Sequence, residues 1–158
     1  MTILAIDPGP VESAWVRYDG RTNSVLLARK EANALVLQQW WSVADVVVIE
    51  QVRSYGMPVG AEVFDTVHWS GRFHQAALGD YGCANPAVVL VPRKDVKLHL
   101  CQSPRANDAT IRQALIDKFG GKDKAIGRKS SPGPLYGLKA DCWQALALGV
   151  TWWETRRG

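Results

Sequence analysis

The sequence predicts an α/β protein built on a mixed five-stranded sheet with helices on its faces. The first part of the chain contains strand-like segments joined by turn signals, which is typical of antiparallel hairpins. The later part alternates strand-like and helix-like segments, which adds parallel strands to the same sheet. The continuous apolar run at 44–49 suits a strand that is buried on both faces. We expect residues 1–158 to form a single domain.

Two of the strands expected in the first half lead into an acidic residue. The expected elements are strands over 2–7, 15–18 and 24–28, a helix over 30–42 and a strand over 44–49. The first strand leads into Asp7, which is followed at once by the turn residues Pro8-Gly9, and the last strand leads into Glu50. Asp19-Gly20 is a hairpin signal between the second and third strands. Each of the two acids therefore stands at the end of a buried, rigid element.

The second half is richer in helices. The expected elements are a loop over 53–60, a helix over 61–78, a strand over 86–91, and helices over 93–101, 109–119 and 139–154. Asp108 is placed as the N-cap of the helix over 109–119, and Gly120-Gly121 ends that helix. Residues 120–137 hold five Gly and two Pro, so we expect a long mobile basic loop there.

The charge distribution favours a polyanionic partner for the second half of the chain. The formal net charge is +4, which permits nucleic-acid binding without requiring it. Between residues 93 and 139, however, eleven Lys and Arg stand against four acids. No apolar run is long enough to cross a bilayer, and the N-terminal residues lack the layout of a signal peptide. The three cysteines follow no metal-binding spacing, so we expect reduced thiols and a cytoplasmic location.

Three isolated acids suggest a metal site. Asp7 and Glu50 end strands, and Asp141 is expected one turn into the apolar last helix, which must pack on the same sheet. Oxygen ligands without His or Cys favour Mg²⁺ or Mn²⁺, and two such ions can activate water against a phosphodiester. Each acid also has a simpler interpretation, as turn chemistry for Asp7 or as a solvated carboxylate for the other two.

These segments resemble the RuvC-type Holliday junction resolvases of the ribonuclease-H-like superfamily. The likeness lies in 5–9 with Ser13, 48–52, Gly71-Arg72, 92–97, 106–108, and Ala140-Asp141 with Ala145-Leu146-Ala147. The segments at 54–60 and 132–137 are similar to those of compact RuvC-like nucleases from bacteriophages and prophages. The resemblance covers nearly the whole chain and depends on the order and spacing of the motifs together.

The resemblance implies a set of site residues. Asp7, Glu50 and Asp141 match the metal-binding acids, and Lys97 matches a basic residue near the active site. The family has a fourth carboxylate or a His three residues before the last Asp, where this chain has Leu138, and Asp108 is a possible substitute. The expected DNA-binding residues are Arg53, Tyr55, Arg93, Lys94, Lys97, Arg105, Lys124, Arg128, Lys129 and Lys139. Tyr55 lies in the loop that enters the junction centre in the family.

The expected function is that of an endonuclease that uses Mg²⁺ or Mn²⁺, with two ions per active site, to resolve four-way DNA junctions. A two-fold homodimer suits paired cuts in a junction, and the bulky helix over 61–78, with Phe64, Val67, His68, Trp69, Phe73 and His74, is the expected interface. Two alternatives stay open. The chain could be a broader flap or fork debranching nuclease of the same superfamily, or a catalytically inactive DNA-binding module.

Overall fold

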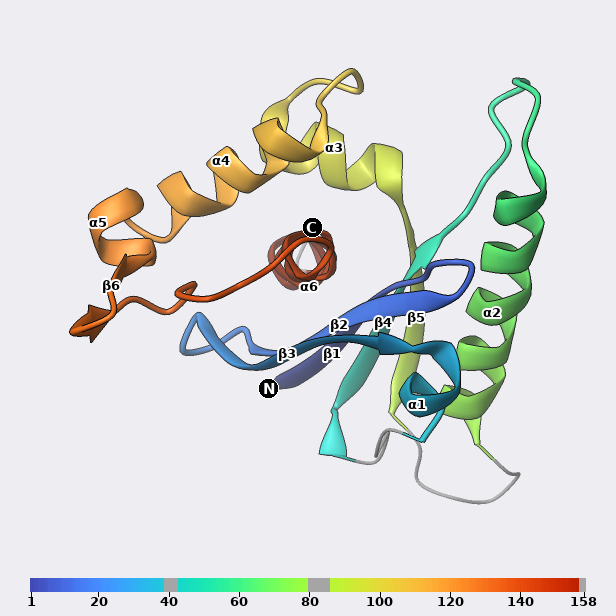
Figure 1. Ribbon diagram of the computed structural model, residues 1–158, viewed down its shortest axis with the longest axis horizontal. Coiled ribbons are helices and arrows are strands. Elements are labelled where there is room, and N and C mark those ends of the chain that lie inside the picture. The colour runs from blue at the N-terminus through green and yellow to red at the C-terminus, as the bar shows by residue number, and fades with distance from the viewer. Residues whose placement is uncertain (39–42, 80–85, 157–158) are drawn as a thin grey trace.

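The computed structural model describes residues 1–38, 43–79 and 86–156 (Figure 1). Its main sheet has five strands in the order β3-β2-β1-β4-β5. The strands are β1 (Thr2–Asp7), β2 (Glu12–Asp19), β3 (Ser24–Ala32), β4 (Val46–Gln51) and β5 (Ala87–Pro92). The pairs β1–β2 and β2–β3 are antiparallel, whereas β1–β4 and β4–β5 are parallel. The mixed five-stranded sheet predicted from the sequence is confirmed.

Helices cover both faces of this sheet. They are α1 (Asn33–Val36), α2 (Ala61–Leu78), α3 (Arg93–Cys101), α4 (Asp108–Lys118), α5 (Lys122–Ala125) and α6 (Cys142–Thr155). In Figure 1, α1 and α2 lie on one side of the sheet, and α6 lies on the other with α3 and α4 beyond it. A small second sheet pairs β6 (Gly127–Arg128) with β7 (Ser131–Pro132).

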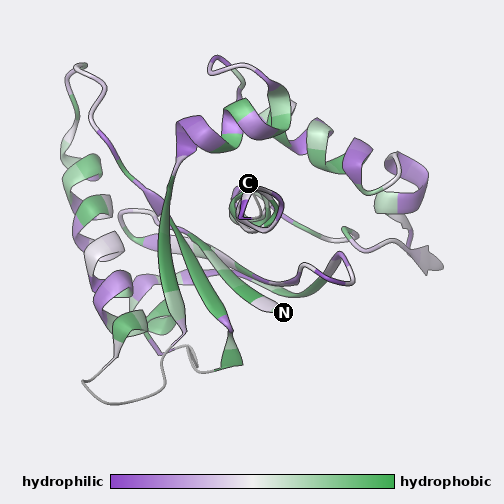
Figure 2. Cartoon of the chain, turned by 180° about the vertical axis from the view of Figure 1, so that it is seen from behind, coloured by the Kyte–Doolittle hydropathy of each residue, from purple (hydrophilic) through white to green (hydrophobic). Residues whose placement is uncertain are grey.

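The central strand β1 contributes to two separate hydrophobic cores. Ile3 and Ala5 belong to the larger core beneath α6, whereas Leu4 and Ile6 belong to the smaller core beneath α1 and α2. This follows from the alternation of side chains along a strand, and it explains why the sequence of β1 is apolar without interruption. Figure 2 shows the same hydrophobic character along the central strands.

Helix α6 is apolar on all sides because it is buried on all sides. It packs between the sheet and the helices α3 and α4, and all ten residues from Cys142 to Thr151 are buried. The predicted start at residue 139 is three residues too early, since α6 begins at Cys142. Asp141 therefore lies at the N-cap position and not one turn inside the helix. Among the described residues, no helix is both long and apolar enough to span a membrane.

The helix predicted over 30–42 is wrong in the part that the structure describes. Residues up to Ala32 continue strand β3, and only Asn33–Val36 are helical; 39–42 lie outside the described residues. The strand is longer than predicted because the hairpin with β2 continues through the charged residues, where Trp15 Nε1 donates to Glu31 Oε1 at 3.0 Å. Cross-strand pairing therefore overrides the helical spacing of the apolar residues.

The segment predicted as a loop over 120–137 contains α5 and the β6–β7 pair. Ala125 and Leu135 are buried in the larger core and fix the segment at two points. The Leu135 N–H donates to the Ala125 carbonyl at 2.8 Å. Gly133 allows this close approach, because a Cβ there would lie 2.4 Å from the same carbonyl oxygen. Two apolar anchors are enough to order a sequence that is otherwise rich in Gly, Ser and Lys.

Candidate active site

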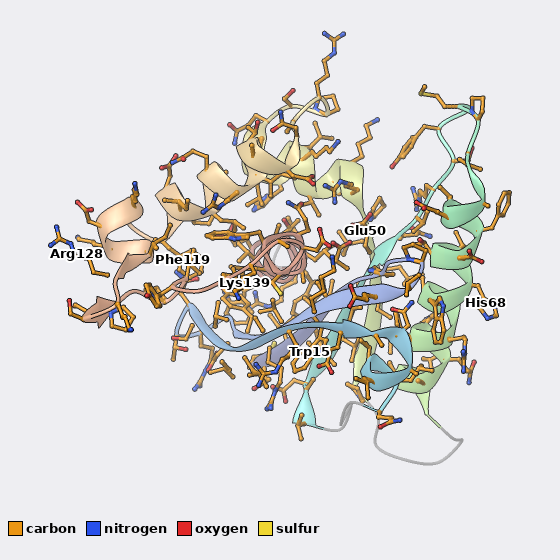
Figure 3. All side chains as sticks on the ribbon, in the orientation of Figure 1. Trp15, Glu50, His68, Phe119, Arg128 and Lys139 are labelled. Atoms are coloured by element: carbon orange, nitrogen blue, oxygen red, sulfur yellow. The ribbon has the colours of Figure 1, made fainter. Side chains whose placement is uncertain are left out.

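Asp7 and Glu50 are brought together by the register of two parallel strands. Ile6 of β1 lies beside Ile49 of β4, so the next residue of each strand is one of the two acids. Side chains alternate along a strand, and Ala5 and Val48 face α6, so Asp7 and Glu50 face α6 as well. Both acids stand at the carboxyl ends of their strands, which is where sites form in sheets covered by helices. Figure 3 shows Glu50 on β4 near α6.

Asp141 joins them from the N-cap position of α6. This helix packs directly on β1, β2 and β4, so its N-terminus opens onto the face that carries the two strand acids. Ala140, directly before it, has a φ of +40°, a left-handed conformation that is costly for a residue with a Cβ. The Asp141 side chain does not cap its own helix. Its carboxylate is therefore available to other partners.

The electrostatics of Asp7 reflect this convergence. Burial raises the pKa of Asp7 well above its ordinary value, and the neighbouring Glu50 raises it further by its charge and by a side-chain hydrogen bond. Arg93 acts in the opposite direction, and Asp141 adds a smaller increase to the same pKa. Glu50 and Asp141 thus both interact electrostatically with Asp7. Among the described residues, no three acids, His or Cys form a ready-made metal cage.

Two cationic side chains neutralise the outer acids. Lys30 Nζ lies 2.7 Å from Asp141 Oδ2, and Arg93 Nη1 lies 3.4 Å from Glu50 Oε2. The hydrogen bond with Asp141 raises the pKa of Lys30. Lys30 reaches this position through the sheet, since it pairs with Ala14 on β2, and Ala14 pairs with Asp7 on β1. A row of residues across the sheet therefore carries Lys30 and the two strand acids on one face.

A buried hydrogen-bond network shapes the turn after Asp7. The Ser13 hydroxyl accepts from the Gly9 N–H at 3.0 Å and donates to Asn33 Oδ1 at 2.5 Å. Asn33 Nδ2 in turn donates to the Gly9 carbonyl at 2.9 Å. Gly9 is required by space, because a Cβ there would lie 2.2 Å from the Glu12 carbonyl oxygen. The network fixes the exit of β1 and with it the position of Asp7.

Replacing Ser13 by Ala should lower the free energy of unfolding by roughly 1–3 kcal/mol, because Asn33 and the Gly9 N–H lose a buried partner. Urea denaturation followed by circular dichroism measures this. Ser24→Ala is the matched control, since its hydroxyl makes an exposed 3.3 Å contact to the Thr22 carbonyl and should change stability by less than about 0.5 kcal/mol. Equal effects of the two substitutions would contradict a special role for the network.

Several predicted DNA-binding residues lie beside these acids. Tyr55, Arg93, Lys94 and Lys97 line one hollow of about 330 Å³, together with Pro104. Tyr55 is 62% exposed, which leaves its ring free for contact with a partner molecule. Arg93 links this hollow to Glu50. The structure thus places one aromatic and three basic side chains at the edge of the candidate site.

The other predicted DNA-binding residues lie outside this hollow. Lys139 lines a separate hollow of about 440 Å³ with Lys30. Figure 3 shows Arg128 at the end of the molecule remote from Glu50, and Lys124 and Lys129 belong to the same segment. Arg53 donates to Gln51 Oε1 at 2.9 Å and is exposed, and Arg105 is exposed in the connection between α3 and α4. The basic residues form more than one group.

The N-cap prediction for Asp108 is wrong. Asn107 occupies that position, and its Oδ1 accepts from the Thr110 N–H at 2.9 Å. Asp108 instead contacts Arg93 Nη2. Asn is as good an N-cap as Asp, and α4 begins one residue earlier than predicted, which puts Asn107 at the cap. Leu138 packs against the larger core and supplies no ligand atom from its side chain.

Only some of the residues that were expected to form a subunit interface on the helix over 61–78 are exposed on α2. Phe73 is fully buried against the sheet and is not available to a second subunit, whereas Trp69 packs against the same smaller core and is only partly buried. Phe64 and Val67 are 67% and 47% exposed. His68 points away from the sheet in Figure 3. An exposed apolar face does exist, and it is smaller than expected.

Lys30, Ser13 and Asn33 were missed as site residues by sequence reasoning. Lys30 could have been found by extending the hairpin register, since the pairing of β2 with β3 carries it into the row of Asp7. Ser13 entered only as part of a family motif, and its partner Asn33 is 20 residues away in the chain. The sequence carries no local signal for that contact.

Comparison with solved structures identifies the architecture. A structure of RuvC from Thermus thermophilus has a TM-score of 0.69 at 18% sequence identity, covering 100% of this chain and 97% of that chain. RuvC from T. thermophilus in complex with a Holliday junction substrate has a TM-score of 0.62 at 19% identity, covering 100% and 96%. This chain has the RuvC fold. The expected ribonuclease-H-like architecture is thereby confirmed. No protein-family model matches the sequence, and no curated protein does.

Proposed function

We propose that this chain is a metal-dependent endonuclease that resolves branched DNA, with four-way junctions as its substrate. The observation that carries the proposal is the convergence of Asp7, Glu50 and Asp141 at the carboxyl ends of β1 and β4 and the start of α6. Three elements far apart in sequence deliver acids to one place on a RuvC fold. One of these acids is buried and electrostatically strained, which is typical of functional sites.

The residues at this place fit hard divalent cations. Asp7, Glu50 and Asp141 offer carboxylate oxygens, the ligand type that Mg²⁺ and Mn²⁺ prefer. The pKa of Asp7 is raised first by burial and then by the charges of Glu50 and Asp141, and a cation between these acids would offset that repulsion. When bound, a pair of such ions supplies Lewis-acid activation of the phosphodiester and of the attacking water. We propose that cleavage leaves 5′-phosphate and 3′-hydroxyl ends.

The chain's own basic residues would hold the DNA against the acids. Arg93, Lys94 and Lys97 border the site and are suited to bind the phosphates on either side of the cleaved bond. Lys97 is the one that we assign to the reacting phosphate. Tyr55 stands beside them with an exposed ring, and an aromatic side chain can unstack bases where a duplex is already interrupted.

A homodimer would match the symmetry of the substrate. A four-way junction has two-fold character, and the comparison structure of RuvC is in complex with a Holliday junction substrate. We propose the exposed part of α2, with Phe64 and Val67, as the contact between subunits. With the DNA of a cell as its substrate, the protein would act in the cytoplasm, or in that of the host if a phage encodes it.

Junction cleavage with and without Mg²⁺ tests the proposal. A labelled four-way junction, a replication fork, a flap and a linear duplex are incubated with the protein and the products are mapped. The proposal expects symmetric paired nicks in the four-way junction only when metal is present. Cleavage of flaps and forks without paired nicks would favour a broader debranching nuclease. Binding without cleavage of any substrate would favour an inactive DNA-binding module.

Removing Lys30 should tighten divalent-cation binding. In Lys30→Met, Asp141 loses the ammonium group that now neutralises it, and the Kd for Mn²⁺ should fall roughly two- to fivefold, the scale of a partly exposed ion pair. Isothermal titration calorimetry of the metal-free protein measures this. Arg29→Met is the matched control, since it removes the same charge from the adjacent residue of β3, on the opposite face. Weaker binding in Lys30→Met than in the control would show that Lys30 holds Asp141 in place for the metal.

A further inference from the structure

Arg93 connects the candidate site to a fourth acid. One nitrogen of its guanidinium contacts Glu50 Oε2, and the other donates to Asp108 Oδ1. A guanidinium group is small and planar, so the two carboxylates that it contacts must lie close to each other. Asp108 is 58 residues from Glu50 in the chain, and the fold brings it to the edge of the same site.

Asp108 also shares a hollow with Asp141. This hollow has a volume of about 290 Å³, and its lining includes both acids together with Arg112, Leu138 and Gln144. Asp108 is contributed by the first turn of α4, whereas Asp141 stands at the start of α6. Asp108 is therefore linked to Glu50 through Arg93, and it shares the lining of one hollow with Asp141.

Capping of α4 does not explain the position of the Asp108 side chain. Asn107 caps α4, since its Oδ1 accepts from both the N–H and the hydroxyl of Thr110 at 2.9 Å. Asp108 is 67% exposed. A carboxylate in the first turn favours the helix dipole in any orientation, so that effect does not account for its contact with Arg93.

Leu138 also lines this hollow and contributes no carboxylate to it. Its backbone carbonyl accepts from Trp143 Nε1 at 2.9 Å, which ties the residue to α6, and its side chain packs against the larger core. Asp108 and Asp141 are the two acids in the hollow, together with the base Arg112.

We propose that Asp108 is a fourth acidic residue of the active site, which binds a divalent cation together with Asp141. The inference depends on the proposed metal-dependent nuclease function and names a further ligand for it. Carboxylate oxygens from two acids that line one hollow suit Mg²⁺ or Mn²⁺. Arg93, which now contacts Asp108 and Glu50, is suited to turn to a DNA phosphate when a metal ion takes its place.

Titration of the metal-free protein with Mn²⁺ tests this. Asp108→Asn should weaken Mn²⁺ affinity on the order of tenfold or more, as expected when a carboxylate ligand is lost. Asp123→Asn is the matched control, since it makes the same charge change in α5, away from Glu50, and should leave affinity unchanged. Equal Mn²⁺ affinities of the two variants would overturn the proposal.

A second variant separates ligation from an indirect effect. Adding Leu138→Asp to Asp108→Asn places an acid in the same hollow and should restore most of the Mn²⁺ affinity. No restoration in a double variant whose circular dichroism is native would overturn the assignment of Asp108 as a ligand. Asp7→Asn is titrated in parallel. If Asp7→Asn loses affinity and Asp108→Asn does not, only the present proposal fails; if neither loses affinity, the proposed metal-dependent function fails as well.

Discussion

Replacing Asp7 by Asn, or Glu50 by Gln, should lower the rate of four-way junction cleavage by roughly 10³-fold or more. A bound metal ion stabilises the transition-state charge by several kcal/mol, and each 1.4 kcal/mol is about tenfold in rate. Both acids stand at the ends of buried strands, so an amide of the same shape preserves the fold while removing the charge. Gel-based cleavage under single-turnover conditions measures the effect.

Junction binding should survive these two substitutions. The basic residues that border the site do not depend on the acids for their place in the fold, because Arg93, Lys94 and Lys97 lie on α3. An electrophoretic mobility shift in Ca²⁺ or EDTA provides the control, with Asp65→Asn on the exposed side of α2 as a charge-matched variant. Cleavage at the wild-type rate by both active-site variants would disprove the assignment.

The same Asp7→Asn substitution should make the metal-free protein more stable at neutral pH. The pKa of Asp7 is raised, chiefly by burial and next by Glu50, above its ordinary value near 3.8. Between the ordinary and the raised pKa the folded chain holds a proton that the unfolded chain has lost. Stability therefore falls as pH rises through that window. Asn carries no charge, so the stability of the variant does not fall in this way as pH rises. Its Tm at neutral pH should therefore exceed that of the wild type.

Thermal unfolding from about pH 3 to pH 8 in EDTA measures the effect. The two Tm curves should meet at a pH below about 4, where Asp7 is protonated in both states, and separate as pH rises. Excess Mn²⁺ should narrow or reverse the difference in Tm between variant and wild type at neutral pH. A metal ion that binds the folded state stabilises it, and the variant has lost one of the carboxylates that would bind the ion. A variant that is less stable than the wild type at every pH would show that the charge of Asp7 stabilises the metal-free fold.

The sheet and two of its acids could be predicted because the signals are local. Continuous apolar runs that end in Asp7 and Glu50 mark buried strands with charged ends, and the strand-like alternation of residues 15–18 marks the hairpin. Burial on both faces then requires helices above and below. Asp7 follows Ile6 by one residue and Glu50 follows Ile49 by one residue, and Ile6 and Ile49 are partners in the parallel register. Both acids therefore lie on the same face of the sheet.

Other predictions failed where long-range contacts outweigh local preference. The segment at 120–137 has the composition of a loop, yet Ala125 and Leu135 insert into the core and order it. The apolar spacing after Lys30 suggested a helix, yet pairing with β2 extends the strand to Ala32. In both cases the free energy of tertiary packing exceeds the small propensity differences that sequence patterns report.

The sequence by itself determined the class of fold and the order of its main elements, and it singled out three acids as candidates, because periodicity and turn chemistry act within a few residues. Only the tertiary structure decided the partners of those acids. Lys30 reaches Asp141 across 111 residues, and Arg93 joins Glu50 to Asp108. Such ion pairs depend on strand register and on how α4 and α6 pack over the sheet, and the chain encodes them only through the whole fold.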